Sequence, residues 1–444
     1  MTMKKQLFAV VALLALVASA EQSFQLSEDF KLRLGASVRT RWEFFDQSVV
    51  SPSSEEAADA VTNQYLRVRA RAWAALDFRD DFTVNISLNS RFHKVSNSPS
   101  NPNDQDAKTW EFPEEVIFDA LNIVFHHFLT DGLSLTLGRQ NFGLGNGMII
   151  ADATPFDQGR TMYMDGLFLK YKTEKLTGHA FVTYNSWKDN IVFINDKHRR
   201  LHCGDVFTAG AYVTGGNKAL SADAYAIFND IHDNHPREAE RNHYRDSEAS
   251  ILTTGFRLFG QPVDLIDYSL ELACQTDQHE TWHHPLSFDK MAFMGDGRLN
   301  FHLPVFEEIK PILGFEYVHF SGDKERGKHS HGWNSVLSKA PLWTEELMPI
   351  LLNGNWTNLN GFHNTLRFTP YKDISVLFDL TDYRLDEQQD MAGKHLGLLF
   401  STSVGYKFND NLSFAFQYAH FKPGNSYHDG HDSDWGRLEA TINF

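Results

Sequence analysis

Cysteine is scarce in this sequence, and so are long hydrophobic runs. The two cysteines, Cys203 and Cys274, are too few for a disulfide framework. We place them three predicted strands apart, or ~14 Å at ~4.8 Å per strand, which is farther than a disulfide spans. The mean hydropathy is −0.38. After residue 17 no segment approaches the ~20 apolar residues of a membrane-spanning helix. These absences exclude a disulfide-stapled domain and a helical membrane protein.

The first twenty residues have the pattern of a secretory signal. Lys4 and Lys5 form a basic start, residues 7–17 are apolar, and residues 18–20 read Ala-Ser-Ala, which is a cleavage motif. The apolar core is too short to span a membrane as a helix. We therefore predict residues 1–20 as a signal peptide and residues 21–444 as the mature chain, starting near Glu21.

The chain also lacks an excess of positive charge. It carries 41 Lys and Arg against 57 Asp and Glu, a net charge of −16. The predicted signal holds two lysines and no acid, so the mature chain has 39 basic and 57 acidic residues, a net charge of −18. This balance argues against nucleic acid as a partner.

What the sequence does have is a strict alternation of polar and apolar residues. In residues 65–76, YLRVRARAWAAL, the even positions are all apolar, whereas Arg67, Arg69 and Arg71 occupy odd positions. Successive side chains of a strand point to opposite faces, so this pattern predicts a strand with one apolar face and one guanidinium face. The alternation recurs in residues 31–45, 82–92 and 434–444, and aromatic residues make up 13% of the chain. An exported chain with these features is typical of an outer-membrane barrel.

Eighteen segments have this strand pattern, and the connections between them alternate between short and long. Short turns at one rim and long loops at the other are the pattern of a transmembrane antiparallel β-barrel, with the short turns on the periplasmic side. A β-sandwich also alternates, but it has no reason to sort its loops by length. Because backbone groups in hydrocarbon must all be paired, the last strand should pair with the first. The predicted strands are 31–45, 64–76, 81–93, 116–128, 133–142, 163–172, 177–187, 206–214, 219–229, 250–259, 263–275, 291–301, 309–320, 361–369, 373–384, 395–408, 411–421 and 434–444.

The polar face of these strands is expected to line the lumen, because an arginine facing lipid at mid-depth costs ~2–4 kcal/mol. Acidic residues instead crowd the predicted loops. A basic lumen inside an acidic shell favours an anionic solute. The alternative is a general porin in which an arginine row faces lumen acids such as Glu316 and sets a transverse field. The predicted lumen arginines are Arg33, Arg39, Arg41, Arg67, Arg69, Arg71, Arg91, Arg257, Arg298, Arg367 and Arg437.

Three stretches resemble the alginate export family of outer-membrane barrels. The most specific is residues 133–171, LSLTLGRQNFGLGNGMIIADATPFDQGRTMYMDGLFLKY, with its Gly-Arg-Gln motif at 138–140. Residues 310–323, KPILGFEYVHFSGD, and residues 358–380 are similar to later strands of that family. The resemblance implies a monomeric eighteen-stranded barrel whose electropositive constriction passes the polyuronate alginate.

By the matching motif, the resemblance implies two further constriction arginines, Arg139 and Arg160. It also implies that Asp152 and Asp157 support the constriction by anchoring these arginines and their loop, and Glu316 is a further lumen acid that could pair with an arginine. Strict alternation places Arg139 out of phase with its strand, so we expect it at the rim or beyond a bulge.

Other classes of function have weaker signals. No nucleophile elbow and no coupled acid–base pair is readable, so an outer-membrane enzyme is a distant alternative. An adhesin or receptor would use the tryptophans of the 321–360 loop. The HDGHDSD stretch at 428–434 could bind a divalent cation, but we expect a solvated loop. We predict no cofactor and no dedicated metal site.

The sequence thus predicts a passive channel of the bacterial outer membrane for an anionic saccharide. Its expected partners are outer-membrane lipid and lipopolysaccharide, the saccharide, and the barrel assembly machinery. The last is expected to recognise the terminal strand, which ends in Phe444. We expect a monomer.

Overall fold

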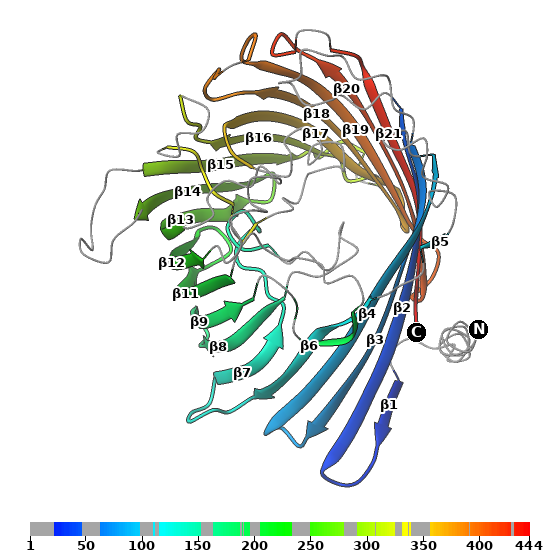
Figure 1. Cartoon of the computed structure of the whole chain (residues 1–444), viewed down its shortest axis with the longest axis vertical. Coiled ribbons are helices and arrows are strands. Elements are labelled where there is room, and N and C mark those ends of the chain that lie inside the picture. The colour runs from blue at the N-terminus through cyan, green and yellow to red at the C-terminus, as the bar shows by residue number, and fades with distance from the viewer. Residues whose placement is uncertain are drawn as a thin grey trace.

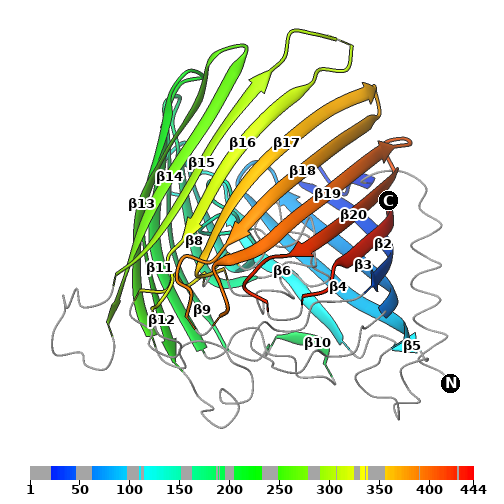
Figure 2. The same ribbon diagram turned by 90° about the horizontal axis from the view of Figure 1, so that it is seen from above.

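The computed structural model of the chain forms a closed barrel of antiparallel strands (Figures 1 and 2). None of the described residues belongs to a helix long and apolar enough to cross a membrane. The structure describes residues 22–46, 63–97, 110–111, 115–151, 163–186, 189, 191–195, 205–232, 249–278, 291–306, 308–324, 331–335, 337–338, 356–389, 391–427 and 430–444.

Eighteen strands form the wall. Each one pairs with the next along the chain, and the last pairs with the first. The strands are β2 (Phe30–Asp46), β3 (Asn63–Phe78), β4 (Phe82–Asn97), β6 (Glu115–Phe125), β7 (Leu133–Gln140), β8 (Met164–Lys172), β9 (Leu176–Asn185), β11 (Asp205–Gly216), β12 (Ser221–His232), β13 (Ala249–Val263), β14 (Ile266–Gln278), β15 (Met291–His302), β16 (Ile312–Phe320), β17 (Leu359–Tyr371), β18 (Ile374–Arg384), β19 (His395–Lys407), β20 (Leu412–Pro423) and β21 (Ser433–Asn443).

The predicted fold class is confirmed. Each predicted strand corresponds to one wall strand, and its ends lie within four residues of the observed ones. Three further strands were not predicted, namely β1 (Gln22–Gln25), β5 (Trp110–Glu111) and β10 (Val192–Asn195). At two to four residues they are too short for an alternation to be read. Strand β5 pairs with β4, and β10 pairs with β6. Both pairings lie near the ends of β4 and β6 that lead into long loops.

The two rims of the barrel differ in the length of their connections, as the sequence predicts. Short turns such as 79–81, 264–265 and 372–373 gather at one rim, which is uppermost in Figure 2. The connections after β7, β12 and β16 are long and leave from the opposite rim. At the short-turn rim, Arg79 donates a 2.8 Å hydrogen bond to Asp29 and so lowers the pKa of that carboxyl.

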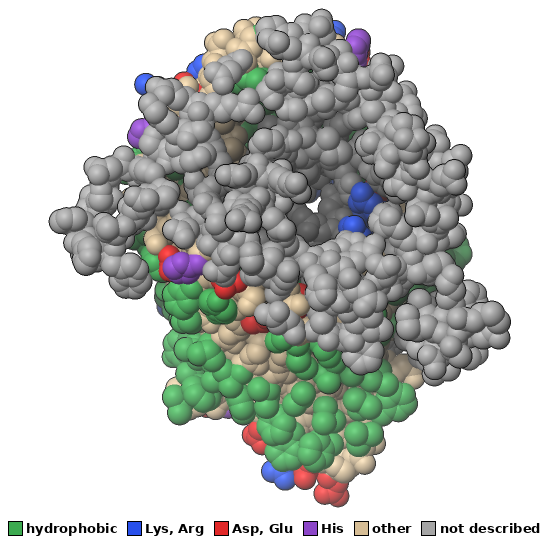
Figure 3. All heavy atoms as spheres, viewed as in Figure 1, with side chains coloured by type: hydrophobic (Ala, Val, Ile, Leu, Met, Phe, Trp, Pro, Cys, Tyr) green, Lys and Arg blue, Asp and Glu red, His purple; other side chains and the backbone are tan. Residues whose placement is uncertain are grey.

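The wall is apolar outside and polar inside. On β2, Leu34 and Trp42 point outward and are 36% and 40% exposed, whereas Arg39 and Arg41 point inward and are almost fully buried. Figure 3 shows the outer surface of the lower wall covered by hydrophobic side chains, with charged groups at its tip. Near the short-turn rim, the aromatic rings of neighbouring strands β2, β3, β4 and β6 follow one another. They belong to Phe30, Phe78, Phe82 and Phe125. Such a row is typical of the aromatic girdle at a membrane interface.

The barrel closes between its first and last wall strands. Residues Ser37 to Asp46 of β2 pair with β21, so the predicted closure is confirmed. Beyond this ladder, Ala36 and the terminal Phe444 exchange two backbone hydrogen bonds of 3.0 and 2.8 Å. Strand β1 pairs with residues 31–34 of β2, where β21 no longer reaches. The N-terminal strand therefore extends the seam toward the short-turn rim.

Gly35 on β2 shows how one missing side chain shapes the inner face. It lies opposite Trp73 of β3, and a Cβ atom added to Gly35 would lie 2.5 Å from the indole ring. The indole therefore lies flat on the glycine backbone.

We expect Gly35→Ala to displace the indole and destabilise the barrel by about 1–3 kcal/mol, the usual cost of overpacking. Urea unfolding of the refolded protein in detergent measures this change in free energy. Gly178→Ala on β9 is the matched control, because nothing lies within 4 Å of a Cβ at that position. Equal stability of the two variants would contradict the packing role of Gly35.

Candidate functional site

Seven arginines project from four neighbouring strands into one side of the lumen. We call this group the arginine sector. Its centre is a row in which Arg39 of β2, Arg69 of β3 and Arg91 of β4 lie directly opposite one another. Like charges in opposed positions destabilise a sheet, so packing alone does not account for this row. The sector consists of Arg39, Arg41 and Arg437 on the β2–β21 seam and Arg67, Arg69, Arg71 and Arg91 on β3 and β4.

Three carboxylates lie within the arginine sector. Arg41 Nε is 2.5 Å from the Glu439 carboxylate, and Arg71 is 2.7 Å from Asp119 of β6. Glu43, whose side chain is fully buried, lies 3.4 Å from Arg67. Within the arginine sector, counting only residues that the structure describes, seven guanidiniums therefore lie with three carboxylates, and these ten side chains carry a net charge of +4. Figure 3 shows Lys and Arg side chains at the edge of the opening that is visible through the barrel.

The opposite side of the lumen is rich in acids, and we call it the acid sector. On β12 to β18 the inward side chains include four buried carboxylates and the half-buried Glu316. Two of the predicted lumen arginines lie among them. Arg257 is 2.7 Å from Asp223, and Arg298 is 2.9 Å from Glu316 and 3.3 Å from Asp296. The acids of this sector are Asp223, Glu271, Asp296, Glu316 and Asp379.

The remaining lumen arginines lie toward the short-turn rim. Arg33 on β2 forms a two-pronged ion pair with Asp77 of β3, with N–O distances of 2.7 and 3.0 Å. Arg367 is an exposed residue of β17 opposite Ile312 and Leu377. Arg33 is therefore locally neutralised at the mouth of the lumen.

The chain that follows β7 folds into the barrel and covers the acid sector. Asn146 donates a 2.6 Å hydrogen bond to Asp296 on β15, although β7 and β15 are far apart around the wall. Gly145 has φ +67°, and a Cβ there would lie 2.7 Å from the Tyr212 hydroxyl, so only glycine fits. Residues 148–151 of this segment are buried.

A second segment, residues 331–335 with 337–338, lies against the first. Ser338 Oγ donates to the Gly147 carbonyl at 2.6 Å, and the Ala151 N–H donates to the Leu337 carbonyl at 3.1 Å. The Gln275 side chain of β14 exchanges two hydrogen bonds with the backbone of Asn334. The two segments form one inner layer, defined as residues 141–151, 331–335 and 337–338. Its contacts with Asp296 and Gln275 fix it to the acid-sector side of the lumen.

We expect Asn146→Ala to loosen this inner layer, because a hydrogen bond to a charged partner contributes ~1.5–3 kcal/mol. Single-channel recording should then show a larger and noisier conductance. Asn85→Ala is the control, since Asn85 donates to Asn122 within the wall. Identical traces for the Asn146 variant and the wild type would show that the layer is held elsewhere.

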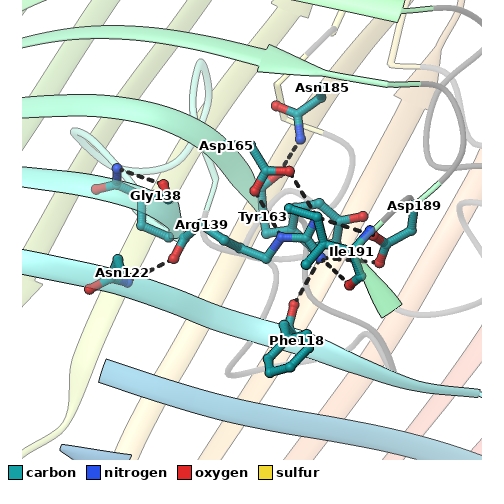
Figure 4. Close-up of polar contacts among 10 residues, drawn as sticks. Phe118, Asn122, Gly138, Arg139, Tyr163, Asp165, Asn185, Asp189 and Ile191 are labelled. Carbon is teal, nitrogen blue, oxygen red and sulfur yellow. Dashed lines mark hydrogen bonds and ion pairs between the residues drawn. The ribbon is translucent and has the colours of Figure 1, made fainter. Parts of the chain in front are cut away.

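Arg139 belongs to the Gly-Arg-Gln motif at 138–140, directly before the inner layer. Its side chain is buried in a separate cluster of polar groups (Figure 4). Its guanidinium makes two 2.8 Å hydrogen bonds to Asp165 of β8 and two of 3.1–3.2 Å to Asp189. It also donates to the Phe118 and Ile191 carbonyls and stacks on the Tyr163 ring, 3.5 Å from the ring centroid. This arginine therefore joins β6, β7, β8 and the segment before β10.

The backbone of the motif permits this arrangement. Gly138 has φ +113°, and a Cβ there would lie 2.4 Å from the Leu121 carbonyl oxygen. Arg139 is the penultimate residue of β7 and directly follows this distorted position. It lies at the strand end, one of the two placements expected from its phase. Asp165 and Asp189 were not foreseen as its partners, although Asp165 lies in the same motif and directly opposite Arg139 in register.

The other residues implied by the motif, Asp152, Asp157 and Arg160, lie outside the described residues, as does Cys203. Cys274 is a free thiol on β14.

Sequence reasoning also missed residues that contact the lumen charges, among them Asp119 and Asn146. Asp119 lies where the register between β4 and β6 shifts, which hides its inward direction. Asn146 acts through a loop whose path the sequence does not indicate. Neither residue could be assigned from the alternation of polar and apolar positions alone.

The sequence and the fold both resemble known proteins. A family model described as alginate export matches residues 30–441. No curated protein matches the sequence. Among solved structures, OccAB1 of Acinetobacter baumannii is 9% identical with a TM-score of 0.58, over 93% of this chain and 96% of that chain. OpdK of Pseudomonas aeruginosa, solved with vanillate, is 13% identical with a TM-score of 0.55, over 93% of this chain and 98% of that chain. At these identities the likeness to solved structures concerns the fold.

Proposed function

Because the chain belongs to the alginate export family and forms a closed barrel of the bacterial outer membrane, we propose that its lumen passes an anionic saccharide. The solute class is an alginate-like polyuronate or its oligomers. It moves by diffusion, and the arginine sector attracts it.

The observation that carries this proposal is the charge asymmetry of the lumen. The inner layer covers groups of the acid sector, whereas the seven guanidiniums and three carboxylates described in the arginine sector carry a net charge of +4. A positive wall raises the local concentration of anions. Because the guanidiniums are spread over four strands, a solute with several carboxylates can exchange one contact for the next. No single contact then needs to be tight, which passage requires.

A second candidate is an outer-membrane channel for a small aromatic carboxylate. The structure of OpdK with vanillate favours it, because vanillate is a carboxylate anion and the two barrels share a fold. The arginine sector would serve either solute. The two candidates differ in the number of carboxylates that the solute presents at once. The family and the neighbours are channels, and we propose no catalytic activity.

The experiment is a planar-bilayer recording of the purified protein under a KCl gradient. We expect a reversal potential that indicates chloride selectivity. Oligouronates of increasing length are then added, and block of the current should strengthen with length. Vanillate added alone is the comparison. Block by vanillate without block by oligouronates would favour the second candidate, and a cation-selective pore indifferent to both would contradict the proposal.

A further inference from the structure

The outward face of the wall has a groove between β11 and β16. Its volume is about 1050 Å³, at the upper limit of the ~300–1,000 Å³ usual for a small-molecule site. The small residues Gly295 and Gly297 line it together with the larger Phe256, Phe293 and Tyr317. These three aromatic side chains are among the exposed hydrophobic residues of the barrel. The groove is therefore outside the lumen and separate from the channel described above.

The two glycines make the groove, although the backbone does not need them. Gly295 lies opposite Leu272 and His319, and Gly297 lies opposite Leu270 and Tyr317. The nearest atom to an added Cβ would be 3.4 Å away at Gly295 and 3.8 Å away at Gly297, which is ordinary contact distance. Neither glycine has a left-handed φ. Side chains would fit at both positions, so the depression is a consequence of their absence.

The groove continues the lipid-facing surface of the barrel. Its three aromatic lining residues belong to the same outward, apolar set of residues that covers the rest of the wall. A second copy of the chain is a poor occupant. In a two-fold interface the same patch meets itself, so two concave surfaces would face each other and leave a larger void. A flexible hydrocarbon chain fits a concave apolar groove without that mismatch.

One end of the groove is polar. His319 and Tyr317 of β16 both bond the Asn360 side chain of β17, at 2.9 and 2.7 Å. These residues lie near the ends of β16 and β17 that lead into the long loops, which is the extracellular side. We propose that the groove holds an acyl chain of an outer-leaflet lipid, with the polar part of the lipid at His319 and Asn360.

Native mass spectrometry of the full-length protein tests this, with lipid A and phosphatidylethanolamine as the two probes after delipidation. We expect one lipid A molecule to remain bound to the wild type at detergent concentrations that strip other lipid. Gly295→Leu with Gly297→Leu fills the groove and should reduce retention at least tenfold. Gly178→Leu is the control, because this outward glycine lies outside the groove and has nothing within 4 Å of its Cβ.

Equal retention by wild type and the filled variant would overturn the proposal. So would retention of phosphatidylethanolamine in preference to lipid A, because that would exclude the outer-leaflet source. A dimer that the filling substitutions abolish would assign the groove to a second copy and overturn it as well. If the double variant does not fold, Phe293→Ala removes an aromatic ring that lines the groove and should reduce retention too. Reversal potential should be unchanged in all these variants, so failure here is distinct from failure of the proposed function.

Discussion

Replacing the central row of the arginine sector, Arg39→Gln with Arg69→Gln and Arg91→Gln, should reduce anion selectivity about twentyfold at low salt. The net charge of the ten described side chains of the sector falls from +4 to +1. Each guanidinium attracts an anion at ~7 Å by ~0.6 kcal/mol in water, so three supply ~1.8 kcal/mol. The reversal potential under a KCl gradient measures the change. The difference should shrink as the salt concentration rises, because salt screens these charges.

The triple variant should fold at least as well as the wild type. Removing like charges from directly opposed positions relieves repulsion in the sheet, and glutamine keeps the lumen polar. The control is Arg79→Gln with Lys218→Gln and Arg384→Gln, which changes the net charge by the same amount. These three cations pair with acids at the rims. Unchanged selectivity in the central-row variant, or an equal loss in the control, would show that the row is structural.

Block of the current by oligouronates distinguishes the contribution of the central row from that of the remaining arginines. If the polymer moves from one guanidinium to the next, the triple variant should lose block by long oligomers more than block by short ones. A uniform loss at all lengths would indicate a single site instead. Arg41→Gln alone should have less effect on block, because Glu439 lies 2.5 Å away and already offsets that charge.

The wall of the barrel could be predicted from the sequence because the surroundings of each wall residue depend on its position along its own strand. Alternate side chains of a strand face either the lipid or the lumen. The directions of Leu34 and Arg39 can therefore be assigned without any knowledge of the neighbouring strands. The closure of β21 onto β2 followed from the need to pair every backbone group in hydrocarbon. The same reasoning correctly gave the number of wall strands.

The interior could not be predicted in the same way, because it depends on which strands face each other across the lumen. Nothing near Asn146 in the sequence indicates that it meets Asp296, 150 positions away. The alternation of polar and apolar residues alone placed Arg257 and Arg298 with Arg69 among the predicted lumen arginines. The structure places them beside acids, in the acid sector. Charge along a strand is a sequence property, but charge around a lumen is a property of the closed barrel.

Arg139→Met should be the most destabilising of the single substitutions, at about 3–5 kcal/mol. Methionine keeps much of the length of the side chain but leaves Asp165 and the fully buried Asp189 without their cation. An uncompensated charge in a buried position accounts for a cost of that size. Urea unfolding measures the total, and hydrogen exchange should show the loss of protection concentrated in β10 and around Tyr163. Arg384→Met is the matched control, because its pair with Asp382 is exposed and such pairs contribute ~0–1 kcal/mol.

Two further variants identify the cause of the stability loss in Arg139→Met. Arg139→Lys keeps the charge but loses the planar fork that bonds both carboxylates, so it should recover only part of the stability. Arg139→Met combined with Asp189→Asn also removes the buried Asp189 carboxylate that would otherwise lack its cation. This double variant should be more stable than Arg139→Met alone, despite the second substitution. If the double variant is less stable by the sum of both single effects, the ion pair is not the source of the loss. If the channel keeps its selectivity in Arg139→Met, which removes the charge, then Arg139 positions the segment before β10, and the arginine sector sets the charge that a solute meets.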